Sequence, residues 1–181
     1  MFPLLRTVRV TRAFPDFDKG CALYYRAFPP EEQLPMDALL DGTLATDFQA
    51  IYNEDNHFCG FFSYLNHGDI SHIMFLAVEE EFRERGYGSR ALSIMSDILK
   101  GKRIILDIED VLLGETEENA EQRKKRKAFY LRNGYRESGI RYYWKDVPYE
   151  LLVSGGSITA KEFQNFWLAF RRKNEVILIE E

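Results

Sequence analysis

The segment of residues 75–90, FLAVEEEFRERGYGSR, most constrains the fold, because it joins an apolar run, a charged connector and two closely spaced glycines. The apolar run ends at Val78 and predicts a strand, and a helical apolar pattern follows Gly88. Gly86 and Gly88 let the backbone approach a ligand without a Cβ in the way. The free N–H groups and the dipole at such a helix start favour an anion. The sequence therefore predicts a strand–loop–helix unit that holds a pyrophosphate.

A dinucleotide fold is the first alternative for this glycine pattern. Residues 86–91, GYGSRA, fit G-x-G-x-x-A, and Asp107 lies about 20 residues on, where an acid that binds ribose is expected. That fingerprint begins directly after its strand, whereas residues 79–85 intervene here. The chain also lacks the repeated strand–helix units of a doubly wound domain. These two departures exclude the dinucleotide interpretation.

Composition indicates a globular protein and sets limits on its partners. The 181 residues are 45% hydrophobic and carry a net charge of −5, which disfavours a general nucleic-acid binder. The two cysteines, Cys21 and Cys59, lack metal-ligand spacing and are expected to be reduced thiols. No apolar run approaches the roughly 18 residues of a membrane span, and the N-terminus lacks a signal-peptide pattern. We expect a cytoplasmic protein without a metal and without a membrane partner.

Periodicity predicts an α/β protein with a mixed sheet around one core. Strands are expected at residues 4–11, 48–52, 58–65, 70–78, 103–108, 135–138, 140–145 and 149–153. Helices are expected at residues 14–28, 36–40, 89–99, 121–133 and 158–172. The early strands are expected to be adjacent and antiparallel. The strand, helix and strand over residues 70–108 imply a parallel crossover.

Two motifs resemble the GNAT superfamily of acetyl-CoA-dependent N-acetyltransferases. Arg83-x-x-Gly86-x-Gly88 resembles its Arg/Gln-x-x-Gly-x-Gly/Ala signature between the fourth strand and the third helix. Residues 128–135, AFYLRNGY, are similar to the end of its fourth helix, where a tyrosine precedes a Gly-aromatic pair by four residues. The motifs lie about 40 residues apart, with the helix and strand expected between them.

This resemblance implies a single GNAT-like domain over residues 1–181. It is close over residues 45–145 and loose for the first strand and helix, and residues 157–181 lie outside the family core. The implied fold is a mixed, mostly antiparallel central sheet flanked by helices. Its parallel strand pair is splayed at the acetyl-CoA site.

The resemblance also implies which residues bind acetyl-CoA. The pyrophosphate is expected on the signature loop and helix start, and the pantetheine arm on the end of the fourth strand. The loop residues are Arg83, Arg85, Gly86, Tyr87, Gly88, Ser89 and Arg90, and the strand residues are Leu76, Ala77 and Val78. For the three arginines, simple solvation of a surface is the alternative.

Tyr130 matches the general acid of the family, which protonates the thiolate of coenzyme A. A core tyrosine beside Phe129 is the alternative.

The identity of the general base is open, because Met74 stands where many relatives carry a glutamate. His72 shares the strand face of Met74 and is a candidate for relaying a proton, although a structural histidine is equally consistent.

Two acidic residues and one arginine complete the expected site. Asp107 and Glu109 share a strand face and are expected to hold an ammonium substrate or to accept its proton, with a solvated sheet edge as the alternative. Arg123 stands where relatives often have an asparagine that contacts the coenzyme A arm. The basic run 123–127 is a candidate for the 3′-phosphate, with a solvated helix face as the alternative. It also resembles a nuclear-import or nucleic-acid patch, but three neighbouring glutamates and the acidic chain argue against this.

The resemblance predicts an N-acetyltransferase that moves the acetyl group of acetyl-CoA directly to a primary amine of a small cationic molecule. One alternative is a non-catalytic acyl-CoA-binding or sensory module on the same fold. Another is a protein or peptide N-acetyltransferase, whose groove the acidic insert 112–121 and the C-terminal helix would crowd. The apolar stripe of that helix and the tail 176–179 either pack on their own domain or form a homodimer. The stripe comprises Phe163, Phe166, Trp167 and Phe170.

Overall fold

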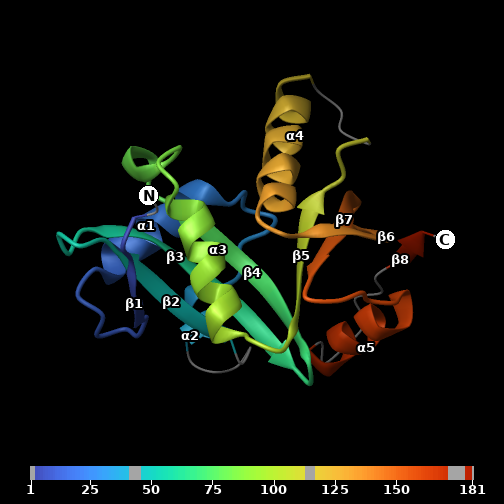
Figure 1. Ribbon diagram of the computed structural model, residues 1–181, viewed down its shortest axis with the longest axis horizontal. Helices are drawn as coiled ribbons and strands as arrows, with labels where there is room; N and C mark the ends of the chain where they lie inside the picture. The colour runs from blue at the N-terminus through green and yellow to red at the C-terminus, as the bar shows by residue number, and fades with distance from the viewer. Residues whose placement is uncertain (1–2, 41–45, 113–116, 171–177, 181) are drawn as a thin grey trace. The chain divides into compact units, whose positions relative to one another are not determined.

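The computed structural model describes residues 3–40, 46–112, 117–170 and 178–180 (Figure 1). The chain forms two compact units, residues 1–66 with 73–100 and residues 67–72 with 101–181. The strands are β1 (Arg6–Arg9), β2 (Thr46–Tyr52), β3 (Phe58–His67), β4 (Ile70–Val78), β5 (Arg103–Glu109), β6 (Arg136–Trp144), β7 (Val147–Ser154) and β8 (Leu178–Glu180). The helices are α1 (Phe17–Ala27), α2 (Met36–Leu40), the short 3₁₀ turn η1 (Glu80–Phe82), α3 (Tyr87–Ile98), α4 (Glu117–Arg132) and α5 (Ala160–Phe170).

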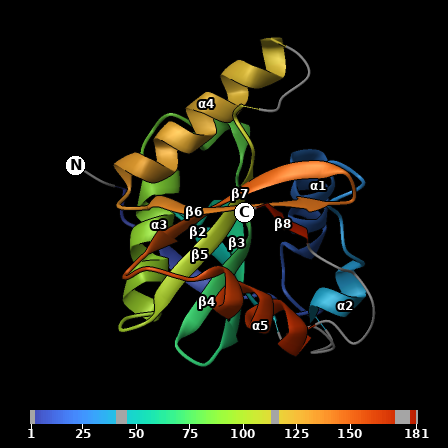
Figure 2. The ribbon, with the colours of Figure 1, turned by 90° about the vertical axis from the view of Figure 1, so that its right-hand side faces the viewer.

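The first unit is a sheet with helices on both faces. β1 pairs antiparallel with β2, and β2 pairs antiparallel with β3, as predicted. Helix α3 lies on one face of these strands, and α1 and α2 lie on the other (Figures 1 and 2). The buried stripe of α3 comprises Ala91, Leu92 and Met95. The sheet thus separates two apolar layers, which fits strands that are buried on both faces.

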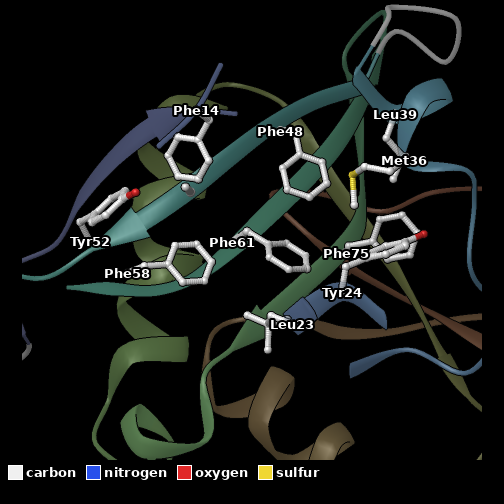
Figure 3. Close-up of a cluster of buried hydrophobic side chains, with 12 residues drawn as sticks. Phe14, Leu23, Tyr24, Met36, Leu39, Phe48, Tyr52, Phe58, Phe61 and Phe75 are labelled. Carbon is white, nitrogen blue, oxygen red and sulfur yellow. The ribbon is translucent and has the colours of Figure 1, made fainter. Parts of the chain in front are cut away.

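The layer under α1 and α2 is an aromatic cluster (Figure 3). Tyr24 of α1 meets Phe75 of β4 with ring centroids 5.0 Å apart, in the edge-to-face arrangement that aromatic pairs prefer. The Tyr24 hydroxyl accepts the Leu34 N–H at 2.7 Å and donates to the Leu34 carbonyl at 3.1 Å. The buried phenol is therefore satisfied as well as packed.

The second unit is built around β5, β7 and β6. β7 pairs antiparallel with both neighbours, and β8 pairs with the other edge of β6. The start of β4 also belongs to this unit. The Arg103 N–H donates to the Asp69 carbonyl at 2.8 Å, and His72 meets Asp107 further along. The later residue of β4 meets the later residue of β5, so the two strands run in the same direction here. This part of the predicted parallel pair is confirmed.

Three expectations about the elements are corrected. The two strands predicted at residues 135–138 and 140–145 are one strand, β6, whose register shifts around Gly139, where φ is +82°. Helix α4 begins at residue 117 rather than 121, because its first turns lack the apolar stripe by which a helix start is recognised. The connector after β4 contains η1, which its charged sequence concealed.

The C-terminal helix packs on its own unit. Phe163 and Phe166 are buried, and the Phe163 ring lies 5.2 Å from that of Tyr142 on β6. Residues 178–180 form β8 against β6, whereas residues 171–177 lie outside the described residues. Self-packing therefore accounts for the two buried stripe residues and for the described part of the tail.

Candidate active site

The start of α3 has the backbone that its glycine pattern predicts. Gly86 is the residue before the helix and adopts a left-handed conformation with φ of +83°. The Arg90 N–H donates to the Gly86 carbonyl at 3.0 Å, so the helix begins at Tyr87, two residues before the predicted start. The first N–H groups of a helix have no partner within it and favour an anion. The backbone at residues 86–89 thus has the helix start that suits an anion, and binding of a phosphate there remains a prediction.

The connector that precedes this helix is ordered by its own side chains. Phe82 is buried, and its ring lies 4.9 Å from that of Tyr87. Arg83 donates through Nε to the Val78 carbonyl at 3.0 Å, and Arg85 donates to the Glu81 carbonyl at 3.2 Å. These two arginines therefore brace the loop, and a contact with phosphate remains a prediction for both.

Gly60 of β3 supports the end of β4, a role that sequence reasoning missed. A Cβ on Gly60 would lie 2.1 Å from the Ala77 carbonyl oxygen, and the φ of Gly60 is +154°. The Glu79 N–H donates to the Cys59 carbonyl at 2.8 Å in the same region. A glycine inside a strand often marks such a close backbone approach, and that signal was present in the sequence.

Tyr130 lies at the end of α4, where the chain geometry is closely defined. The Tyr135 N–H donates to the Tyr130 carbonyl and the Gly134 N–H to the Leu131 carbonyl, the pair of bonds of a Schellman motif. Gly134 has the φ of +87° that this motif requires. Burial raises the pKa of the Tyr130 phenol, and the charge of Arg126 partly offsets this. The phenol therefore remains protonated at neutral pH, as a proton donor must.

His72 and Asp107 form a close pair in the second unit. The distance from His72 Nε2 to Asp107 Oδ2 is 2.6 Å, and the two side chains are 3% and 14% exposed. The Trp167 ring lies 5.2 Å from the His72 ring, and the Phe166 ring lies 6.0 Å away. Two rings of α5 therefore cover His72. His72 and Asp107, which the sequence suggested separately as site residues, contact each other.

Glu109 and Arg123 form a second pair beside the first. Arg123 Nε donates to Glu109 Oε2 at 2.6 Å, with side-chain exposures of 17% and 27%. Further along the basic run, Lys127 pairs with Glu150 at 2.8 Å and also with Glu137. Two members of the run are thus tied to carboxylates of their own unit, and a contact between Arg123 and coenzyme A remains a prediction.

The chain is similar to known proteins in sequence and in fold. Residues 47–137, just over half of the chain, match the family model of the acetyltransferase (GNAT) domain. A GNAT-family protein from Bacteroides thetaiotaomicron superposes with a TM-score of 0.72 at 24% identity, covering 91% of this chain and 94% of that one. No curated protein sequence matches the chain.

Two further solved structures share the fold at lower identity. An aminoglycoside 6′-N-acetyltransferase complexed with coenzyme A is 19% identical, with a TM-score of 0.63 over 82% of this chain and 96% of that one. A chimeric spermidine N-acetyltransferase from Vibrio cholerae is 16% identical, with a TM-score of 0.60 over 83% and 94%. At these identities the likeness establishes the fold alone, which is the mixed, mostly antiparallel α/β fold predicted from the sequence.

The match to the acetyltransferase (GNAT) domain makes this protein an acyltransferase that uses acetyl-CoA as its cosubstrate. The chain belongs to the GNAT family of acetyltransferases. Its left-handed Gly86 and its helix start suit a pyrophosphate, so the residues present fit this cosubstrate. No helix in the described ranges is long and apolar enough to cross a membrane.

Proposed function

We propose that this protein transfers the acetyl group of acetyl-CoA directly to a primary amine of a small cationic molecule. One observation carries the choice of acceptor: Asp107 and Glu109 are two partly buried carboxylates on the same face of β5. A carboxylate in a shielded site attracts an ammonium more strongly than one in water. The spermidine and aminoglycoside N-acetyltransferases of the same fold support an amine acceptor.

The backbone N–H groups of residues 86–89 hold the pyrophosphate of acetyl-CoA in this proposal. The pantetheine arm lies along Leu76, Ala77 and Val78, where half-buried and buried residues alternate. Strand-like pairing suits an arm that carries amide groups. Arg83, Arg85 and Arg90 supply positive charge for the phosphates.

Two proton transfers accompany the reaction. The acceptor must lose a proton before its nitrogen lone pair attacks the thioester carbon, and Glu109, His72 or a water molecule is the candidate for receiving it. Tyr130 then donates its phenolic proton to the sulfur that leaves, so the products are an amide and the free thiol of coenzyme A. A phenol is a suitable donor because its ordinary pKa near 10 is close to that of a thiol.

Release of coenzyme A thiol from acetyl-CoA across a panel of amines tests the proposal, with an amine-free reaction as the hydrolysis control. The expected result is rapid thiol release with at least one small cationic amine. Binding of acetyl-CoA without acetylation of any amine would instead indicate a binding or sensory module. Acetylation of peptides but of no small amine would indicate a protein N-acetyltransferase.

A further inference from the structure

Two ion pairs of the second unit each leave one buried polar atom unsatisfied. Asp107 uses Oδ2 for His72, while its Oδ1 is buried and meets no hydrogen-bond partner in the described part of the chain. Arg123 uses Nε for Glu109, while its Nη1 is likewise buried and unpartnered among the described residues. Buried polar groups in folded proteins nearly always have a partner, and leaving one unpaired destabilises the fold. Both atoms are therefore open to a hydrogen-bond partner from outside the described part of the chain, such as a ligand.

The two unsatisfied atoms are associated with neighbouring positions on one face of β5. Asp107 carries one of them, and Arg123, which carries the other, is bound to Glu109. Asp107 and Glu109 are two residues apart on β5 and face the same way, so their Cα atoms are about 7 Å apart. Arg123 is held to Glu109 by its Nε, which places its guanidinium at the second of these positions. One small molecule therefore suffices to reach both an unpaired acceptor and an unpaired donor.

The charges of Asp107, Arg123 and Glu109 indicate which chemical group each end of that molecule carries. Asp107 Oδ1 accepts a hydrogen bond and is anionic, so an ammonium is its natural partner. Arg123 Nη1 donates, but Glu109 already balances the charge of the guanidinium at 2.6 Å. A carboxylate at Nη1 would be repelled by Glu109, whereas a neutral oxygen would accept the hydrogen bond without that cost.

We propose that the acceptor is a primary amine that also carries a neutral oxygen a few bonds from its nitrogen, as in amino alcohols and amino sugars. Its ammonium binds Oδ1 of Asp107, and its hydroxyl oxygen accepts from Nη1 of Arg123. His72 is a positioning residue here, because it holds Oδ2 and so directs Oδ1. This inference rests on the proposed function and narrows its acceptor, with simple polyamines and amino acids disfavoured.

A matched pair of amines tests the role of the oxygen. 3-Amino-1-propanol and n-butylamine have similar length and differ by a hydroxyl in place of a methyl group. Their binding to the full-length protein saturated with coenzyme A is measured by ligand-detected NMR titration. We expect 3-amino-1-propanol to bind at least about tenfold more tightly, because a site with unpaired polar groups rejects an analogue that cannot satisfy them. β-Alanine and 1,4-diaminobutane serve as the carboxylate and polyamine probes.

Arg123→Lys tests the donor itself. Lysine keeps the positive charge opposite Glu109 but lacks the planar fork that directs Nη1. We expect the variant, saturated with coenzyme A like the unaltered protein, to lose the preference for 3-amino-1-propanol. Arg132→Lys, at an exposed position of the same helix, is the control and should retain the preference.

Equal binding of the two amines by the unaltered protein overturns the inference, as does tighter binding of β-alanine or 1,4-diaminobutane. A loss of coenzyme A affinity in Arg123→Lys with the amine preference intact also overturns it, and assigns Nη1 to the cosubstrate. The proposed function fails separately. Preferential binding of 3-amino-1-propanol with no acetylation of any amine would contradict the transfer reaction, and the amine-binding site at Asp107 and Arg123 would still be supported.

Discussion

Arg123 donates through Nε to Oε2 of Glu109 at 2.6 Å, so a residue expected to contact coenzyme A is bound to a residue expected to act on the amine. Neither side chain is therefore a simple solvated charge. The pair keeps Glu109 beside a fixed cation and Arg123 beside a fixed anion. Substitution of either one exposes the other as an unbalanced, partly buried charge, which is the costly way to break such a pair.

The base of the reaction can be assigned from pH–rate profiles of two variants. Glu109→Gln and His72→Ala each remove one candidate. The true base must be deprotonated to act, so kcat/KM of the unaltered protein falls on the acidic side. We expect the variant that lacks the base to lose this acidic limb and the other variant to retain it. Retention of the limb in both variants would leave water as the acceptor of the proton.

Tyr130→Phe should lower turnover at least about tenfold while the dissociation constant for acetyl-CoA changes little, because it removes only a proton donor. The matched control is Tyr135→Phe, which removes a hydroxyl from the ring 5.8 Å away and should keep turnover within about twofold. Since burial raises the Tyr130 pKa, the proton is retained beyond the ordinary phenol range, and kcat should show no loss from this group below about pH 10. Unchanged turnover in Tyr130→Phe would remove Tyr130 from the mechanism.

Gly86→Ala should weaken acetyl-CoA binding, measured as a rise in its KM of about tenfold or more. The left-handed φ of +83° costs an alanine about 1 kcal/mol, and relief of that strain would move the helix start. Gly101→Ala is the control, because Gly101 has φ of +86° and open space around its Cβ position. Both variants should lose similar stability in denaturant unfolding, and only Gly86→Ala should change the KM. Equal KM values would show that the loop does not hold the cosubstrate.

Gly60→Ala should destabilise the fold by at least about 2 kcal/mol, because the new Cβ would collide with the Ala77 carbonyl. Gly20→Ala makes the same chemical change inside α1, where, apart from its chain neighbours and the backbone of its own helix, no atom of the described chain lies within 4 Å of the added Cβ. That substitution should stabilise the protein by about 0.5–1 kcal/mol, since alanine favours a helix. Denaturant unfolding of both variants measures the contrast. A tolerated Gly60→Ala would contradict the close approach of β3 and β4 at this position.

Short stretches of the sequence were enough to predict β4, the end of α4 and the signature loop. The continuous apolar run gave the bounds of β4 correctly, and Gly134 marked the end of α4 near Tyr130. The signature loop was located because its glycines are needed for a left-handed turn and a helix start. The start of α4 was missed, because its opening turns are polar on all sides.

The pairing of site residues could not be predicted in the same way. His72 and Asp107 are 35 residues apart, and Arg123 and Glu109 lie on different elements. Which side chains meet depends on strand register and on the angle at which α4 approaches β5, and neither is encoded in a short window. Periodicity correctly placed Asp107 and Glu109 on one strand face, but it could not show that each carboxylate was already engaged.

The most direct test of the account follows the acetyl group itself. Acetyl-CoA labelled with ¹³C in its acetyl group is incubated with the protein and a small cationic amine, and the products are analysed by mass spectrometry. Direct transfer should give one labelled amide for each coenzyme A thiol released, with no labelled protein intermediate. Thiol release with labelled acetate and no amide, or bound acetyl-CoA with no transfer, would contradict it.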